Sequence, residues 1–469
     1  MLNPEEYDLV ILGSGEAGKY LAWTLAAQGK RVAVIERKYI GGSCPNIACL
    51  PSKNFIHSAK VASYFRRGTE FGVTAADGPI DMAVVRDRKR KMVDGLVAMH
   101  LHKYRASGAE LVMGRGMFVA PKTIAVILHA GGTRTLRGEN VVISTGSRAR
   151  IDNTLGLKDA QPLTHVEALE LDHVPGHLVV LGGGYIGLEL AQAMRRLGSR
   201  VTIMERNSSV IHREDRDVTD ALEELLRDEG IDVYTGTTLD RVEGKSGESV
   251  RLFATRGGAE VVIEGTHLLV AGGRVPNTDR IGLEAAGVEI DARGHVKVDE
   301  RLQTTATGVW AVGDCAGSPY FTHVAFDDFR VVRDNMAGAN RVTTGRMVPF
   351  CLFTDPEFAR VGLSETEARE KGIAYRLAKI PMESVLRART LSETRGFMKA
   401  LIAADGDRIL GFTTLGVEAG EVMAVVQIAM TCGMPYTGLR DAVLTHPTIA
   451  EGLVVLFSAV PDRRLIATL

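Results

Sequence analysis

Two cysteines and a lysine share a short segment, GGSCPNIACLPSK, at residues 41–53. Cys44 and Cys49 are five positions apart, and Lys53 follows four positions later. In a regular helix the Cα atoms of such a pair lie roughly 8–9 Å apart, which is too far for a disulfide. The two thiols can therefore bond only where the turn is distorted. Pro45 favours a distorted turn at this point, because proline fits the first turn of a helix better than its interior.

The number of cysteines favours a catalytic role for this pair. Five is an odd and small count for 469 residues, which excludes a disulfide scaffold and indicates a reducing compartment. The opening residues MLNPEEYD carry acids and a proline where a signal peptide is basic, and no apolar run reaches the roughly 20 residues of a membrane span. We expect a cytoplasmic protein with no membrane partner.

Composition and charge describe an ordinary globular chain. The residues are 45% hydrophobic and 24% charged, and the length allows about three domains. The 56 basic and 57 acidic residues give a formal net charge of −1. No nucleic-acid partner is therefore expected.

An internal repeat organises the chain. Residues 7–36 read YDLVILGSGEAGKYLAWTLAAQGKRVAVIE, and residues 177–205 read HLVVLGGGYIGLELAQAMRRLGSRVTIME. Each unit predicts an apolar strand, a glycine loop, an amphipathic helix and a second strand that ends in an acid. The aligned positions are Gly13, Gly15, Gly18 and Glu36 in the first unit and Gly182, Gly184, Gly187 and Glu205 in the second. Two complete units predict two dinucleotide sites.

The residue types of each unit have separate physical roles. The first glycine makes the tight turn, the second lets the backbone approach a pyrophosphate, and the third allows close packing of helix on strand. The helix N-terminus then directs free N–H groups at the phosphates, and the acid accepts from ribose hydroxyls. Glu205 favours NAD over NADP, because a 2′-phosphate would face a carboxylate. Arg206 follows at once and could pair with that phosphate, which weakens this preference without reversing it.

Further motifs along the chain identify a family resemblance. They are STGSR at 144–148, GGGYIGLE at 182–189, GGRVPN at 272–277, TTATGVWAVGDCAG at 304–317 and HPTIAE at 446–451. Together with the first glycine unit and the cysteine segment they run nearly from end to end. The chain resembles the class I pyridine nucleotide–disulfide oxidoreductases, the family of glutathione reductase, dihydrolipoamide dehydrogenase and mercuric reductase.

This resemblance implies an α/β fold with two Rossmann-like dinucleotide-binding domains, one for FAD and one for NAD(P), and a C-terminal α+β dimerisation domain. The implied boundaries are 1–150 for the first part of the FAD domain, 151–272 for the NAD(P) domain, 273–346 for the second, central part of the FAD domain and 347–469 for the dimerisation domain.

The resemblance also implies which residues contact each cofactor. For FAD they are Gly13, Gly15, Gly18, Glu36, Gly42, Ser43, Lys53, Thr145, Gly146, Gly313 and Asp314. For NAD(P) they are Gly182, Gly184, Tyr185, Gly187, Glu205, Arg206 and Gly273. Asp314 ends the apolar run VWAVGD, where an acid can accept from ribityl hydroxyls.

The same resemblance implies a redox role for the cysteine pair. Cys49 would lie nearest the flavin as the charge-transfer thiol, and Cys44 would be the interchange thiol that attacks the substrate disulfide. Both need thiolate character, because the thiolate is the nucleophile. Lys53 would pair with Glu189 beside the flavin. Tyr185 resembles the aromatic gate that covers the flavin until nicotinamide displaces it.

His446 and Glu451 resemble the catalytic His–Glu dyad of the family. A histidine titrates near the working pH, so it can take a proton from Cys44 or from a substrate thiol and return it. Glu451 would orient the ring. In the family this histidine reaches the cysteine pair of the other subunit, which implies a homodimer with two shared sites.

Two enzymatic functions remain open. The first is a disulfide reductase or dithiol dehydrogenase acting on a small substrate such as lipoamide. The second is a mercuric- or copper-reductase-like enzyme, because thiolates are soft ligands. Residues 321–335, FTHVAFDDFRVVRDN, are similar to the branch that contains such reductases. Against mercury, neither an N-terminal CxxC nor a cysteine in the final VPDRRLIATL is present.

The other soft side chains are interpreted as core, and no resident metal site is expected. They are Met423, Met430, Met434, Cys432, Cys315 and Cys351. The helical spacing of the methionines is typical of packing. A non-enzymatic flavin-binding protein is a third possibility, but it leaves the cysteine pair and the His–Glu dyad unexplained.

Overall fold

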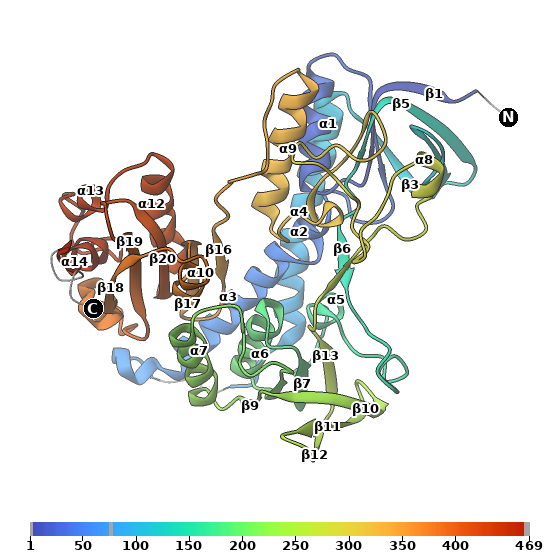
Figure 1. The fold of residues 1–469 in the computed structure, drawn as a ribbon. Helices are drawn as coiled ribbons and strands as arrows, with labels where there is room; N and C mark the ends of the chain where they lie inside the picture. Colours follow the sequence, from blue (N-terminus) through green and yellow to red (C-terminus); the bar gives the residue numbers. More distant parts are fainter. Residues whose placement is uncertain (1–2, 75–77, 464–469) are drawn as a thin grey trace.

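The computed structural model describes residues 3–74 and 78–463 (Figure 1). Residues 1–2 of the opening segment and 464–469 of the final segment, on which expectations were based above, lie outside the described residues. In the described part of the chain no helix is both long and apolar enough to span a membrane.

The first sheet contains the first glycine unit. Five parallel strands run in the order β3-β2-β1-β5-β15, and β4 pairs antiparallel with β3 and β5. The strands are β1 (Glu5–Leu12), β2 (Val32–Glu36), β3 (Glu110–Ala120), β4 (Thr123–Leu128), β5 (Thr133–Ile143) and β15 (Val309–Ala311). β2 is buried at every position, as parallel strands covered on both faces are.

The helices of this part of the fold come from distant parts of the sequence. They are α1 (Glu16–Ala27), α2 (Ser43–Asn46), α3 (Cys49–Arg66), α4 (Met82–Ser107), α8 (Leu283–Ala286) and α9 (Thr322–Met336), with the 3₁₀ turns η1 (Gly68–Phe71) and η2 (Gly313–Ala316). Of these, α3 leads away from the sheet, and its buried residues Phe55, Ala59 and Ala62 join the core of the second glycine unit. α1 and α9 pack side by side although about 300 residues separate them (Figure 1). The first sheet is therefore completed by chain that follows the second glycine unit.

The second glycine unit forms a smaller parallel sheet in the order β13-β7-β8-β9. Its elements are β7 (His177–Leu181), α6 (Tyr185–Leu197), β8 (Arg200–Met204), α7 (Arg216–Asp228), β9 (Asp232–Tyr234) and β13 (His267–Val270). An antiparallel sheet flanks it, made of β10 (Thr237–Lys245), β11 (Ser249–Arg256) and β12 (Ala259–Gly265). The connections run through α5 (His165–Ala168) and the pair β6 (Ser147–Ala149) and β14 (Arg274–Pro276).

The C-terminal part is built on a five-stranded antiparallel sheet in the order β16-β17-β20-β19-β18. Its strands are β16 (Phe350–Leu352), β17 (Glu357–Gly362), β18 (Tyr375–Pro381), β19 (Phe397–Ala403) and β20 (Ile409–Gly416). Its helices are α10 (Glu365–Glu370), α11 (Leu386–Thr390), α12 (Ala419–Thr431), α13 (Tyr436–Arg440) and α14 (Gly452–Ser458), with the 3₁₀ turn η3 (Met382–Ser384). Two Rossmann-like units and a C-terminal α+β unit confirm the predicted fold class.

Candidate active site

A cavity of about 1290 Å³ is lined by residues of all three parts of the fold. Fourteen residues from the sequence predictions line it: Gly13, Gly15, Glu36, Gly42, Ser43, Cys44, Cys49, Lys53, Thr145, Gly146, Tyr185, Glu189, Gly313 and Asp314. The predicted residues outside its lining are Gly18, Gly182, Gly184, Gly187, Glu205, Arg206, Gly273, His446 and Glu451. The cavity therefore joins the first glycine unit to the cysteine pair, and most of the second unit lies outside it.

The cysteine pair lies at a break between two helices. Cys44 is in α2 and Cys49 begins α3, and Ala48 between them leaves helical conformation with φ −128° and ψ −104°. Pro45 is the third residue of α2, within its first turn. Both cysteines are half-buried free thiols in this structure. The distorted turn that a disulfide between them requires is thus present.

The two thiols have different acidities. The hydrogen bond that Cys44 donates to Cys49 raises the pKa of Cys44 and is the largest cause that lowers the pKa of Cys49, to about 6. The Thr322 hydroxyl, 3.2 Å from the Cys49 sulfur, and the charge of Lys53 contribute to this lowered value. At neutral pH, Cys49 is the thiolate of the reduced pair and Cys44 keeps its proton.

Lys53 of α3 forms an ion pair with Glu189 of the second glycine unit in the cavity wall. Lys53 Nζ lies 2.7 Å from Glu189 Oε2, and the Glu189 side chain is 7% exposed. Glu189 Oε1 accepts a hydrogen bond from the backbone N–H of Phe353 at 2.9 Å. The Glu189 carboxylate on α6 therefore binds both the Lys53 ammonium group on α3 and the backbone of the loop at Phe353.

The first glycine loop leaves the space that a pyrophosphate needs. Gly13 has φ +105°, and a Cβ on Gly18 would lie 2.4 Å from the Gly13 carbonyl oxygen. A Cβ on Gly42 would lie 2.6 Å from the Cα of Gly15. The glycine loop and the segment before Cys44 therefore pack backbone against backbone beside the N-terminus of α1.

Glu36 is placed at the end of β2 as a ribose acceptor would be. Its carboxylate accepts hydrogen bonds from the backbone N–H groups of Ser14, Lys38 and Tyr39 at 2.9, 2.7 and 3.0 Å. These bonds fix the acid beside the glycine loop.

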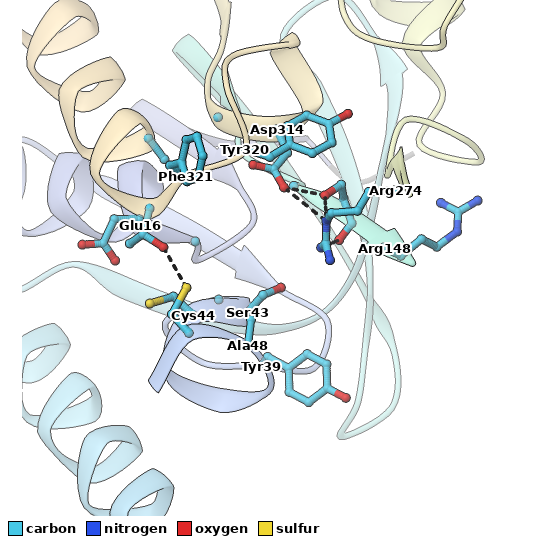
Figure 2. A pocket seen from close by; sticks show the side chains of 18 of the residues that line it. Glu16, Tyr39, Ser43, Cys44, Ala48, Arg148, Arg274, Asp314, Tyr320 and Phe321 are labelled. Atoms are coloured by element: carbon cyan, nitrogen blue, oxygen red, sulfur yellow. Dashed lines mark hydrogen bonds and ion pairs between the residues drawn. The ribbon is translucent and has the colours of Figure 1, made fainter. Parts of the chain in front are cut away.

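A polar cluster faces the cysteine segment across the cavity (Figure 2). Asp314 in η2 accepts a hydrogen bond from Ser147, and Arg274 Nε lies 3.9 Å from Asp314 and donates to Ser147 at 2.8 Å. Burial raises the pKa of Asp314. Close by, the buried Thr145 hydroxyl interacts with the thiol of Cys315. A glycine cradle and a polar cluster in one cavity fit the expected FAD.

The second glycine unit repeats the local geometry of the first. Gly182 has φ +111°, and a Cβ on Gly187 would lie 2.0 Å from the Gly182 carbonyl oxygen. Glu205 accepts from the backbone N–H groups of Gly183 and Asn207 at 2.7 and 2.8 Å. A Cβ on Gly184 would meet nothing within 4 Å. These residues fit a pyridine nucleotide at the N-terminus of α6, with the exposed Arg206 next to the acid.

Tyr185 lies between the two units and contacts aromatic rings from two other segments. Its ring lies edge-on to Phe350 at 5.8 Å and to Phe321 at 6.4 Å between centroids. Burial raises the pKa of Tyr185, so the phenol is neutral. The ring lines the cavity and closes it on the side of α6.

His446 and Glu451 are paired but lie outside the cavity of their own chain. His446 Nδ1 is 3.0 Å from both carboxylate oxygens of Glu451. The His446 side chain is 61% exposed and lines no part of the cavity. The structure brings together the cysteine pair, Lys53 and Glu189, but it does not bring the dyad to them within one chain.

Sequence reasoning missed two residues of the site. Thr322 begins α9 and bonds to Cys49, and no local motif marks it. Cys351 was expected in the core: it packs partly buried against the C-terminal core and also lines the cavity, and burial raises its pKa. No short motif marks either residue: Thr322 begins α9, which packs against α1, and Cys351 lies on β16 of the C-terminal sheet.

The expectation that the remaining soft side chains are core was correct only in part. Cys315 and Met423 are buried, and Met430 packs partly buried against the C-terminal core. Met434 and Cys432 are exposed, because they follow the last buried turn of α12.

Comparisons with known proteins agree with this geometry. The family model described as pyridine nucleotide-disulphide oxidoreductase matches residues 7–328, and the model of its dimerisation domain matches residues 348–456. The chain is similar to the probable pyridine nucleotide-disulfide oxidoreductase RclA of Escherichia coli (strain K12), with 35% identity over 97% of this chain and 99% of that protein.

Two relatives and one solved structure extend the comparison. A mercuric reductase of Staphylococcus aureus is 34% identical over 96% of this chain and 81% of its own length. A dihydrolipoamide dehydrogenase of Chaetomium thermophilum is 34% identical over 95% of this chain and 89% of its own length. The structure of the Cu(II) complex of the HOCl-induced flavoprotein disulfide reductase RclA matches with a TM-score of 0.88, at 35% identity over 97% of this chain and 100% of that chain.

The matched residues include both glycine units, the cysteine pair and the C-terminal sheet. The chain therefore belongs to the pyridine nucleotide-disulphide oxidoreductase family, and it is an NAD(P)H-dependent flavoprotein disulfide reductase.

Proposed function

We propose that this enzyme moves an electron pair between NADH and a small disulfide or dithiol substrate through Cys44 and Cys49. The observation that carries this proposal is the thiol–thiolate pair in the same cavity as the first glycine loop. When bound, FAD supplies the step that joins hydride from the nucleotide to the two-electron chemistry of the disulfide.

The protein residues divide the thiol chemistry between them. The reduced Cys44 sulfur loses its proton, attacks one sulfur of the substrate disulfide and forms a mixed disulfide, and the first substrate thiol leaves with a proton. The Cys49 thiolate then attacks the Cys44 sulfur, closes the Cys44–Cys49 disulfide and expels the second substrate sulfur as a thiolate, which takes a proton from solvent. Thr322 and Lys53 serve this step by holding Cys49 as a thiolate at neutral pH.

We assign the proton transfer to His446 of the partner subunit, held by Glu451. The exposure of His446 and its absence from the cavity of its own chain support a site shared between two chains. The match of residues 348–456 to the dimerisation domain supports the same homodimer. The imidazole would take the proton of Cys44 and return it to the leaving thiol.

The nucleotide is assigned to the second unit, with NAD(H) preferred to NADP(H). Glu205 is buried at the end of β8, with its carboxylate fixed by Gly183 and Asn207. A 2′-phosphate beside this carboxylate would be repelled.

The domain assignment follows from the same reasoning. We assign residues 1–150 and 273–346 to FAD, 151–272 to the nucleotide and 347–469 to dimerisation. The reduced state that the Cys44–Cys49 cycle requires, with so few cysteines in the chain, supports a cytoplasmic location.

Anaerobic titration of the flavin-bound protein tests this proposal. Reduction by NADH should produce a long-wavelength absorbance band that Cys49→Ser loses. Lipoamide or glutathione disulfide should then oxidise the wild type, while Cys44→Ser should lose this turnover by at least about 1000-fold. A Cys44→Ser enzyme with wild-type disulfide turnover would contradict the proposal.

Copper reduction is a second candidate. RclA matches 97% of this chain, and one of its solved structures is a Cu(II) complex. One NADH would then reduce two Cu(II) ions to Cu(I). Adding Cu(II) or Hg(II) to the reduced enzyme in place of the disulfide distinguishes the two functions. Turnover with a metal ion and none with any disulfide would replace the first proposal by the second.

A further inference from the structure

His165 is a buried histidine in the cavity wall to which no role has been given above. It is the first residue of α5, it is 7% exposed, and it lines the same cavity as Cys49 and Asp314. Its Nε2 atom is buried without a hydrogen-bond partner, and within residues 3–74 and 78–463 neither ring nitrogen has one. An imidazole always carries a polar nitrogen, so a buried ring without partners is exceptional.

The His165 side chain takes no part in capping its own helix, α5. The start of α5 is capped by Thr164 and Glu167: the Glu167 carboxylate accepts from the Thr164 N–H at 2.9 Å, and the Thr164 hydroxyl accepts from the Val166 N–H at 3.2 Å. These bonds fix the backbone of His165 without using its side chain. The fold therefore holds the His165 ring at the cavity wall, and no hydrogen bond within the described residues uses its nitrogens.

The neighbouring groups cannot satisfy the ring. The Arg274 guanidinium, the nearby charge, donates to the hydroxyl and carbonyl oxygens of Ser147 at 2.8 and 3.0 Å. Burial and the charge of Arg274 lower the pKa of His165 to about 4. The ring is thus neutral at physiological pH, with one nitrogen as donor and the other as acceptor.

The polar groups next to His165 already have partners. Ser147, Arg274 and Asp314 satisfy one another, and the Thr145 hydroxyl interacts with Cys315. The His165 ring stays unpaired beside this satisfied cluster, which points to a polar ligand in the cavity.

We propose that His165 is a flavin-contacting residue whose neutral imidazole forms a hydrogen bond with the bound FAD. This inference rests on the assignment of the cavity to FAD. It adds a positioning residue from the connection between the two glycine units, so that the flavin is held by a segment that also leads to the nucleotide site.

Release of FAD from the holoenzyme tests this inference. His165→Leu keeps the bulk of the side chain and removes both nitrogens. It should release FAD on dilution about tenfold faster, about 1.4 kcal/mol, and shift the visible flavin absorption, both followed optically. His165→Gln and His165→Asn place an amide near Nε2 or Nδ1, and one of the two should restore slow release.

His267→Leu is the matched control. His267 is 5% exposed on β13, lies outside the cavity lining and contacts the Thr266 hydroxyl at 3.0 Å. Its replacement should lower the thermal unfolding midpoint in saturating FAD without changing the flavin spectrum. His165→Leu should show the reverse pattern, because its ring makes no hydrogen bond in the protein.

Three results would overturn the inference. The first is a wild-type release rate and spectrum in His165→Leu. The second is weaker NADH binding with unchanged FAD release, which would assign the ring to the nicotinamide. If the leucine variant does not fold, wild-type release from both the glutamine and asparagine variants is the third. A wild type that binds no flavin would instead refute the proposed function itself.

Discussion

The two glycine units of this protein share their local geometry and differ in what covers them. In both, the turn glycine has a positive φ and donates to the carbonyl at the end of the next strand, and the acid 23 positions later accepts from the loop. The matching bonds are Gly13 to Ile35 and Ser14 to Glu36 in the first unit, and Gly182 to Met204 and Gly183 to Glu205 in the second.

The surroundings of the second glycine separate the units. Gly15 is packed under Gly42 and within 4 Å of Ser144, whereas Gly184 is open. The first unit is thus enclosed by segments that arrive from elsewhere, as suits a resident cofactor. The second is open, as suits a nucleotide that binds and leaves in each cycle. The same sequence motif can therefore bind a resident cofactor or a nucleotide that exchanges, and the segments packed over its loop decide between the two.

The largest expected difference comes from the third glycine of each unit. A Cβ on Gly18 or Gly187 would lie 2.4 or 2.0 Å from a carbonyl oxygen of its loop. Gly18→Val should yield protein without flavin. Gly187→Val should remain yellow, and its kcat/KM for NADH should fall at least about 100-fold, about 2.7 kcal/mol. Dithionite should still reduce the flavin of Gly187→Val. Loss of flavin from both variants would contradict the different roles assigned to the two glycine loops.

The acids should differ in nucleotide selectivity. Glu205→Gln removes the charge that faces a 2′-phosphate, so the ratio of kcat/KM for NADPH to that for NADH should rise about tenfold. Glu36→Gln should leave this ratio unchanged, because Glu36 serves the other unit. Steady-state kinetics with both nucleotides measures it. An unchanged ratio in Glu205→Gln would remove the basis for the NAD preference.

The cysteine pair, which shares its cavity with the first unit, should show acid sensitivity near pH 6. The pKa of Cys49 is lowered from its usual range to about 6, mainly by the hydrogen bond from Cys44, so its thiolate is present above that pH and is lost as the pH falls through it. The long-wavelength band of the reduced enzyme should follow this titration. Thr322→Val should raise its midpoint by about one unit, and Thr322→Ser should not. Equal midpoints in all three proteins would exclude the Thr322 bond as a cause.

The smallest expected effects concern stability. Gly184 has φ −87° and open space around it, so Gly184→Ala should leave the thermal unfolding midpoint unchanged or raise it, by up to about 1 kcal/mol in stability. Gly42 has φ +85° and its Cβ would press on Gly15, so Gly42→Ala should lower stability by about 1–3 kcal/mol. A destabilised Gly184→Ala would show that the second loop is not open.

Much of the fold and part of the candidate site could be predicted from the sequence. Both strand–loop–helix–strand units lie where the pattern placed them, since a turn glycine with positive φ and a close-packed third glycine are local steric needs. The pairing of Lys53 with Glu189 came from family resemblance, and the structure places the two groups 2.7 Å apart. No periodicity in the chain relates residues 136 positions apart.

Thr322, Cys351 and His165 could not be found in this way. Each lies outside the glycine motifs and reaches the cavity only because α9, β16 and α5 return to it. Whether these side chains are buried, and which distant residues they contact, depends on tertiary packing. A short window of sequence does not contain that information.

The sequence by itself determined the two nucleotide loops, their acids and the broken turn that carries the cysteines, because these depend on backbone conformation within a few residues. Only the tertiary structure decided which loop is enclosed and which thiol is the thiolate. Enclosure and pKa depend on segments hundreds of residues apart, and one hydrophobic core that joins α3, the second glycine unit and the C-terminal sheet brings such segments together.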